Sequence, residues 1–221
     1  MNLLTEMILI NRKPARKIKP KVKGYRGKEP FLKIGEMIPW DSFLERDYIR
    51  LADFDLEVNM IYAQDEKITY LYNGKVRNHF PDFKVITNDN QVWIVEVKPN
   101  AFVNDEENQK KYLAGRAFCE ERGWTYIVVT EDDIRPGFLQ QNLSLLRGLG
   151  AEDVSDETLD FVKMQLEKSN ECTIGHLRMF CMNLSEEDYY ASVYQLIYFQ
   201  ELYCDLILQP ITNDSVIKIK E

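Results

Sequence analysis

The stretch FPDFKVITNDNQVWIVEVKP, residues 80–99, predicts a β-hairpin that carries three ionisable side chains at one end. Two apolar runs are separated by the turn-forming residues 87–90, which is the pattern of two antiparallel strands and a tight connection. Glu96 and Lys98 are two residues apart on the second strand, so they share a face. Asp82 stands at the head of the first strand, where a bend after Pro81 can turn its carboxylate toward that face. We therefore expect two carboxylates and a lysine to meet at one point.

Two carboxylates and a lysine in this order are typical of metal-dependent nucleases. Hydrolysis of a phosphodiester requires a hydroxide to be held in line with a phosphorus that negative oxygens surround. Mg²⁺ neutralises that charge and is bound by one or two carboxylates together with waters, and Mn²⁺ is expected to substitute for it. Lys98 can orient or deprotonate the attacking water and offset charge in the transition state. Glu45 is the candidate for a third carboxylate, so the predicted metal ligands are Asp82, Glu96 and Glu45, and the predicted catalytic set adds Lys98.

Each of these residues also has an ordinary structural explanation. Glu-x-Lys on a strand is common as a surface salt bridge, and Asp82 after a proline is a common turn residue. Ser42 and Glu45 fit a helix capping box. Against these explanations, Glu45 shares a helix face with apolar Tyr48, Ile49 and Ala52, and the strand that holds Glu96 is otherwise hydrophobic. Charges on a buried strand are seldom without a role.

The elements around the hairpin predict a mixed sheet flanked by helices. A helix is expected over residues 40–54, followed by strands at 58–63, 67–72 and 75–80, with Asn73-Gly74 as a two-residue hairpin turn. A helix over 105–121 and a strand over 124–129 then form a crossover, which makes the last strand parallel to the one with Glu96. This is the arrangement of a restriction-endonuclease-like α/β core.

After Arg135-Pro136-Gly137 the pattern changes to helices at 155–167, 173–182 and 186–201, followed by a hairpin from two segments, 202–209 and 215–220. Three helices and a hairpin predict a small winged-helix-like α+β domain. Its third helix begins with Glu186-Glu187-Asp188 and is rich in aromatic residues. Such a module is a poor phosphate binder and a plausible protein-docking surface, unless the aromatic side chains fill the domain's own core. The expected domains are thus a basic arm at 1–33, a nuclease domain at 34–136 and this C-terminal domain at 137–221.

The net charge of −8 is distributed unevenly along the 221 residues. Residues 1–28 hold nine basic side chains and one acid, whereas residues 29–136 hold 13 bases and 21 acids, and residues 137–221 hold 6 and 14. Pro14, Pro20 and Gly24 keep the basic arm extended. Such an arm can follow a phosphate backbone and supply sequence-independent affinity, although a solvated tail or a localisation signal has the same composition.

Composition places the chain among globular proteins. The hydrophobic content of 45% with 12% aromatic residues is that of a folded domain. No apolar run reaches the ~20 residues of a membrane span, and Glu6 interrupts the apolar N-terminus, so a signal peptide is not expected. Four cysteines without paired spacing and two histidines predict free thiols in a reducing cytosol and no zinc site. We expect a cytoplasmic bacterial protein that associates with the nucleoid during its reaction.

The motifs together resemble one family. The helix Trp40 to Asp47 with Glu45, the Phe80-Pro81-Asp82-Phe83 strand start and Glu96-Val97-Lys98-Pro99 are similar to the PD-(D/E)xK core of TnsA, the endonuclease subunit of heteromeric cut-and-paste transposases. The likeness extends over residues 34–136 and includes the segments 74–77, 123–126 and 131–135. Some family members carry Gln at the position of Glu96.

The resemblance implies a subunit that cuts one DNA strand at each transposon end during excision. Its implied partners are double-stranded DNA at those ends, a DDE-type transposase and an AAA+ ATPase regulator that contacts the C-terminal domain. The alternatives are a stand-alone nuclease of the same superfamily that acts in repair, junction resolution or restriction, and a non-catalytic scaffold. The intact set of acids and lysine argues against the scaffold.

Overall fold

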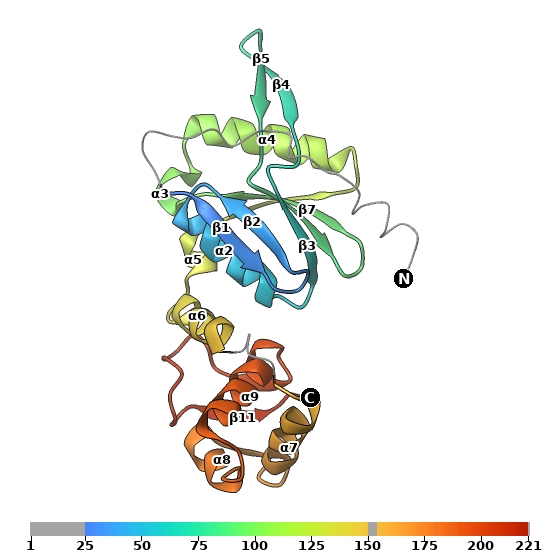
Figure 1. Cartoon of the computed structure of the whole chain (residues 1–221). Helices are drawn as coiled ribbons and strands as arrows, with labels where there is room; N and C mark the ends of the chain where they lie inside the picture. The colour runs from blue at the N-terminus through green and yellow to red at the C-terminus, as the bar shows by residue number, and fades with distance from the viewer. Residues whose placement is uncertain (1–24, 150–153, 221) are drawn as a thin grey trace. The chain divides into compact units, whose positions relative to one another are not determined.

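The computed structural model describes residues 25–149 and 154–220. The chain divides into two compact units, Met1–Ile134 and Arg135–Glu221 (Figure 1). The change of pattern at residues 135–137 therefore coincides with the boundary between the units. Most of the predicted basic arm, up to Gly24, lies outside the described residues.

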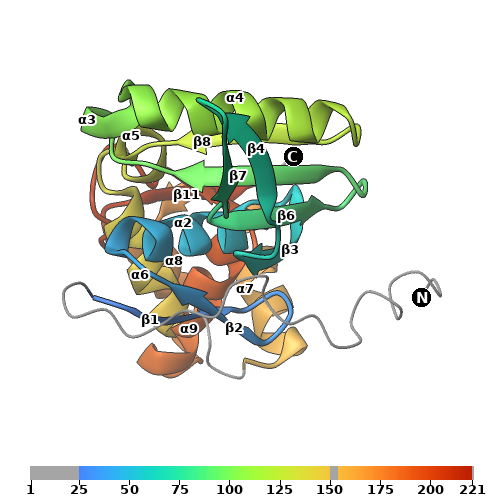
Figure 2. The ribbon, with the colours of Figure 1, turned by 90° about the horizontal axis from the view of Figure 1, so that it is seen from above.

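A four-stranded mixed sheet forms the centre of the first unit (Figure 2). Its strand order is β3–β6–β7–β8, with β3 (Val58–Ala63), β6 (Phe83–Thr87), β7 (Val92–Val97) and β8 (Thr125–Val129). β6 and β7 pair antiparallel, and β8 is parallel to β7, so the predicted hairpin and crossover are confirmed. The mixed sheet between helices fits a restriction-endonuclease-like core.

The crossover from β7 to β8 runs through the short helix α3 (Asn100–Val103) and the long helix α4 (Glu106–Glu120), and α5 (Glu131–Ile134) follows β8. α4 packs along β8 (Figure 2). Gly115 permits this approach, because a Cβ at that position would lie 2.2 Å from the ring of Tyr126. The pair Tyr112 and Tyr126, with ring centroids 6.4 Å apart, fills the space between this helix and the sheet.

The opposite face of the sheet packs against α2 (Phe43–Phe54), which forms the main hydrophobic core with it. Ser42 is the N-cap of this helix, and its hydroxyl accepts a hydrogen bond from the backbone N–H of Glu45. Tyr48 stacks on Phe83 of β6 with the ring centroids 5.4 Å apart. The core takes its members from α2 and from inward positions of the strands, including Ile49, Ala52, Val85 and Val95.

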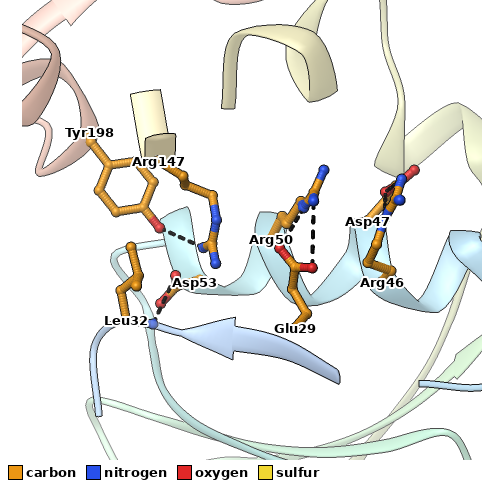
Figure 3. A network of polar contacts seen from close by, with 8 residues as sticks. All are labelled: Glu29, Leu32, Arg46, Asp47, Arg50, Asp53, Arg147 and Tyr198. Atoms are coloured by element: carbon orange, nitrogen blue, oxygen red, sulfur yellow. Dashed lines mark hydrogen bonds and ion pairs between the residues drawn. The ribbon is translucent and has the colours of Figure 1, made fainter. Parts of the chain in front are cut away.

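The first unit also contains a hairpin before α2 that was not predicted from the sequence. β1 (Gly27–Phe31) pairs antiparallel with β2 (Glu36–Trp40), and two contacts fasten the hairpin to α2 (Figure 3). Glu29 accepts a hydrogen bond of 2.6 Å from Nε of Arg50, and the carboxylate of Asp53 accepts the backbone N–H of Leu32 at 3.1 Å. Residues 27–31, which the prediction assigned to the basic arm, are thus part of the nuclease unit.

The strands β4 (Ile68–Tyr72) and β5 (Lys75–His79) form a separate two-stranded hairpin. The turn residues Asn73 and Gly74 have φ angles of 48° and 68°. Two successive positive φ values define the tight turn that matches strand twist, so the Asn-Gly prediction is confirmed. The hairpin extends beyond the sheet (Figure 1), and β4 packs against α4.

In the described part of the second unit, residues 135–149 and 154–220, there are four helices: α6 (Leu139–Leu149), α7 (Asp156–Glu167), α8 (Ile174–Phe180) and α9 (Glu186–Tyr198). The last three agree with the predicted helices, and Ser155, Thr173 and Ser185 cap them. The sequence analysis missed α6. It is tied to α9 by a hydrogen bond of 2.9 Å from Arg147 to the hydroxyl of Tyr198, drawn in Figure 3.

Three short strands complete the second unit in the order β10–β11–β9. β10 (Leu202–Cys204) and β11 (Val216–Ile219) form the predicted terminal pair, and the unpredicted strand β9 (Glu171–Thr173) adds to β11. On α9 the side chains of Tyr189, Tyr194 and Tyr198 are buried in the unit's core, whereas Phe199 is exposed. The core explanation therefore holds for these three tyrosines.

All four cysteines are free. Among the helices of residues 25–149 and 154–220, none has the length and apolar composition that crossing a membrane requires.

Candidate active site

The pairing of β6 with β7 brings the two predicted carboxylates together. Phe83 is paired with Val95, so the next step of the same antiparallel register places Asp82 opposite Glu96. Directly opposite residues on one face have Cβ atoms about 5 Å apart. An oxygen of Asp82 accepts the backbone N–H of Val97 at 2.8 Å, which holds this carboxylate beside the end of β7.

Lys98 completes the predicted group from the first residue after β7. Its Nζ lies 3.2 Å from Oε1 of Glu96, and its backbone N–H donates to the carbonyl of Val129 at 2.9 Å. The backbone bond extends the parallel pairing with β8, so Lys98 remains on the same face as Glu96. The structure thus brings Asp82, Glu96 and Lys98 together as the sequence predicted.

The environment gives the two carboxylates different proton affinities. Desolvation, the charge of Glu96 and the charge of Glu45 raise the pKa of Asp82 well above its ordinary value. Burial alone would raise the pKa of Glu96 as well, but His79 and Lys98 outweigh that effect and lower it. The negative charge of the pair is therefore concentrated on Glu96, and Asp82 is the more readily protonated member.

Burial works against the charge of Lys98, but the carboxylates of Glu96 and Asp82 prevail and raise its pKa. Lys98 therefore carries its proton at neutral pH in the metal-free site. The sequence analysis left two roles open for this residue, to orient or to deprotonate the attacking water. A protonated amine cannot accept a proton, so the electrostatics favour the orienting role.

Two residues at the site were missed by the sequence analysis. Nε2 of His79, the last residue of β5, lies 3.2 Å from Oε2 of Glu96 and 3.2 Å from the hydroxyl of Tyr126. Burial makes the largest contribution to the raised pKa of Tyr126, and the charge of Glu96 adds to it, so the hydroxyl stays protonated. A signal existed for each: His79 is three residues before Asp82, and Tyr126 faces the same side of the sheet as Glu96 because it pairs with Ile94.

Two buried oxygen atoms at the site have no hydrogen-bond donor among the described residues. They are Oε2 of Glu96 and the hydroxyl of Tyr112 on α4. The contact of Oε2 with His79 is close enough for an ion pair but does not satisfy hydrogen-bond geometry. Buried polar atoms are normally satisfied, so a carboxylate oxygen without a well-oriented hydrogen bond, beside a second carboxylate, fits an arrangement made for a cation.

Glu45 occupies the position that the capping-box explanation predicted. Its carboxylate accepts the backbone N–H of Asp41 at 2.7 Å and the hydroxyl of Ser42 at 2.9 Å. Its charge nevertheless contributes to the raised pKa of Asp82, so it lies within electrostatic reach of the site. Within residues 25–149 and 154–220, no group of three His, Cys, Asp or Glu side chains is placed to hold a metal ion. The structure therefore brings the carboxylates of Asp82 and Glu96 together, and the carboxylate of Glu45 lies at the helix cap with its charge acting on Asp82.

Two carboxylates and a lysine at the end of a hairpin, in a mixed sheet flanked by helices, are the arrangement of restriction-endonuclease-like nucleases. A comparison with protein families identifies a more particular relationship. Residues 55–131 match the family described as TnsA-like endonuclease N terminal. The resemblance to TnsA-like nucleases is thereby confirmed for this segment.

The matched segment contains Asp82, Glu96, Lys98 and His79 and begins after Glu45. A comparison with curated proteins finds no match.

Proposed function

We propose that this protein is a Mg²⁺-dependent DNA endonuclease that cuts one strand at transposon ends as a subunit of a heteromeric transposase. The observation that carries the proposal is the cluster of Asp82, Glu96 and Lys98 within a TnsA-like endonuclease domain. Two carboxylates directly opposite each other are unfavourable for folding, so their pairing here indicates selection for a ligand.

Asp82 and Glu96 would hold the metal ion, with Mn²⁺ as a substitute for Mg²⁺. When bound, the ion supplies charge neutralisation for the phosphodiester and lowers the pKa of a coordinated water. Oε2 of Glu96, which lacks a hydrogen bond, is the oxygen that would coordinate the ion, and His79 favours the charged form of this carboxylate. Lys98, protonated and 3.2 Å from Oε1 of Glu96, would orient the attacking water and offset the charge of the reacting phosphate.

The proposed role as a subunit rests on the charges of the chain. The nuclease segment at 29–136 and the segment at 137–221 each have more acids than bases, so neither attracts a polyanion strongly. The basic arm before the nuclease unit would supply phosphate contacts. A DDE-type transposase and an AAA+ ATPase bound at the transposon ends would deliver the DNA.

We propose the second unit as the docking piece for the AAA+ regulator. Its element order after α6, helix–strand–helix–helix–strand–strand, and its antiparallel sheet support a winged-helix-like domain. A cavity of about 450 Å³ at the start of α9 is lined by acids and tyrosines, with Glu186, Glu187, Tyr190 and Tyr194 among them. Acids beside aromatic rings suit an Arg or Lys side chain of a protein partner.

The test is a reconstituted reaction with the transposase, the ATPase and a supercoiled donor plasmid that carries transposon ends. The wild-type protein should cut one strand at each end with Mg²⁺, and Asp82→Ala should bind its partners but not cut. A normal rate of cutting by Asp82→Ala would refute the assignment of the active site.

The docking surface has a matched control within the same unit. Glu186→Gln/Glu187→Gln should remove the stimulation by the ATPase, and Asp156→Gln/Glu157→Gln should not. Both pairs are exposed acids in the first turn of a capped helix, so the effect on helix stability is equal. Equal stimulation of the two variants would contradict docking at α9.

A stand-alone nuclease in repair, junction resolution or restriction is the second candidate. The intact cluster of Asp82, Glu96 and Lys98 would serve such an enzyme equally well. Efficient cutting of arbitrary duplex at physiological salt without any partner would favour it. Negligible cutting by the purified protein, followed by activation when the partners are added, favours the transposase subunit.

A further inference from the structure

The hairpin of β4 and β5 has one face that carries positive charge, whereas the nuclease segment as a whole is acidic. Its strands pair in register, with Tyr70 opposite Arg77 and Tyr72 opposite Lys75. Cross-strand partners share a face, so two tyrosines and two bases alternate along one side of the hairpin. This face is basic, although the segment at 29–136 as a whole has eight more acids than bases.

The bases on this face are available to bind a ligand. Arg77 and Lys75 are exposed, and neither side chain makes a hydrogen bond or ion pair with a described residue. Most other arginines of the unit are engaged: Arg50 binds Glu29, Arg46 binds Asp47 and Arg26 binds Asp41. The fold therefore does not use the guanidinium of Arg77 for its own stability.

Helix α4 adds to this face and turns it into a groove. A hollow of about 160 Å³ lies between hairpin and helix, and its lining includes Tyr70, Arg77, Lys110 and Lys111. Lys110 lies 4.1 Å from the ring centroid of Tyr72 and also pairs with Glu106, and Glu107 is an acid in the lining. Bases interleaved with aromatic rings at the edge of a groove are the surface on which a nucleic-acid backbone binds.

The groove is connected to the active site through strand β5. Arg77 and His79 are two residues apart, so their side chains share a face, about 7 Å apart along the strand. His79 in turn contacts Oε2 of Glu96 at 3.2 Å. Arg77 therefore lies close enough to the site at Glu96 to contact the same DNA strand near the reacting phosphate.

We propose that the β4–β5 hairpin binds the phosphate backbone of the duplex DNA substrate beside the bond to be cut, with Arg77 as the principal contact. This inference rests on the proposed endonuclease function. The hairpin then positions the scissile phosphate relative to Glu96, because β5 forms part of both sites. Arg77 is a binding residue in this arrangement and takes no part in the chemistry.

The outer face of the hairpin is consistent with insertion into a DNA groove. Leu71 and Val76 form a cross-strand pair and are 71% and 70% exposed, so they contribute little to the core. A two-stranded ribbon fits the major groove of B-DNA, and apolar side chains contact thymine methyl groups there. The bases and the groove lie on the opposite face of the hairpin from this pair, and they favour DNA over a protein partner.

The test compares Arg77→Gln with Arg116→Gln in the full-length protein. Both arginines are exposed, both lack a described partner, and each change removes one positive charge from the same unit. Binding of a fluorescein-labelled transposon-end duplex is measured by anisotropy in EDTA over a series of salt concentrations. Arg77→Gln should weaken binding several-fold and reduce the slope of log K against log salt by about 0.9, whereas Arg116→Gln should change neither.

A second measurement locates the contact. Uncharged methylphosphonates replace single phosphates around the cut position mapped in the reconstituted reaction. The wild-type protein should lose affinity when one particular phosphate near the cut is replaced, and Arg77→Gln should be insensitive to the same replacement.

Three outcomes would overturn the inference: equal binding by the two variants, no measurable binding of duplex by the wild-type protein at low salt, or a methylphosphonate effect that is unchanged in Arg77→Gln. A Leu71→Ser variant that loses activation by the partners while its DNA binding is normal would assign the hairpin to a protein partner and also contradict it. The proposed function is judged separately, because cutting that depends on Asp82 can persist when any of these results is obtained.

Discussion

Nε2 of His79 lies 3.2 Å from Oε2 of Glu96, although the two residues belong to different sheets. The contact joins the β4–β5 hairpin to β7, the strand that carries Glu96. It also explains why burial does not neutralise Glu96, since His79 and Lys98 together lower the pKa of this side chain. His79 is therefore a positioning residue for the proposed metal site.

Replacement of His79 should weaken binding of the metal ion. His79→Ala removes the group that holds Glu96 charged, and loss of such a supporting partner typically costs 10- to 100-fold in metal affinity. The Mg²⁺ concentration that gives half-maximal cutting should rise by that factor, and the rise in Tm that Mg²⁺ produces should shrink in parallel. Tyr126→Phe, which removes only the hydroxyl next to His79, should show a smaller effect. An unchanged Mg²⁺ dependence in His79→Ala would show that the contact is purely structural.

Removal of the charge on Asp82 should stabilise the metal-free protein while abolishing cutting. Asp82→Asn retains an oxygen that can accept the backbone N–H of Val97 and relieves repulsion from Glu96 and Glu45. We expect a rise of a few degrees in Tm in EDTA, because 1 kcal/mol corresponds to about 2–4 °C for a chain of this size. Mg²⁺ should raise the Tm of the wild-type protein and not that of the variant. A lower Tm in EDTA for the variant would contradict the assignment of a repulsive pair.

The same carboxylate should give stability a defined pH dependence. Its pKa is raised in the folded protein, so the folded state binds a proton more tightly than the unfolded state does. This contribution is fully present below the ordinary pKa of about 3.9 and is lost as the pH rises through the folded value. The difference in Tm between Asp82→Asn and the wild type should therefore be small at acid pH and grow toward neutral pH. A difference in Tm that does not change with pH would mean that the neighbours of Asp82 do not raise its pKa.

Glu45 can be tested apart from its capping role. Gln at this position retains the acceptor for the N–H of Asp41 and removes the charge. The free energy of unfolding of Glu45→Gln should therefore lie within a few tenths of a kcal/mol of the wild-type value. Cutting should nevertheless fall, because the charge acts on the site. Ser42→Ala should cost about 1 kcal/mol of stability and leave cutting intact at a temperature where the protein is folded. Full activity of Glu45→Gln would limit this residue to the helix cap.

Gly115 should be intolerant of a side chain. A Cβ would lie 2.2 Å from the ring of Tyr126, so Gly115→Ala should destabilise by about 1–3 kcal/mol and displace the ring from His79. Gly148→Ala is the matched control within α6: no atom of the described residues lies within 4 Å of its added Cβ, and helix propensity predicts a gain of about 0.5–1 kcal/mol. Urea denaturation of both variants measures the difference. Equal stability changes would show that α4 can shift away from β8.

The sequence by itself determined the elements whose signals are local. Residues 80–99 fixed the hairpin and its register, because a turn between two apolar runs leaves only one pairing that buries both. That register placed Asp82 opposite Glu96 and Lys98 beside it. The predicted helix starts near residues 155, 173 and 186 agree with the structure, where Ser155, Thr173 and Ser185 are the N-caps and each acts only on the adjacent turn.

The tertiary structure decided what depends on contacts between distant segments. β1 and β2 are five-residue strands that each contain a proline, and their pairing and their attachment through Glu29 to Arg50 have no local signature. Three-residue β9 is likewise too short for a periodicity. His79 and Tyr126 are 47 positions apart and meet at Glu96 only because the hairpin, α4 and β8 pack around one face of the sheet. Sequence periodicity states which face a side chain occupies, but only packing determines which residues share the space above that face.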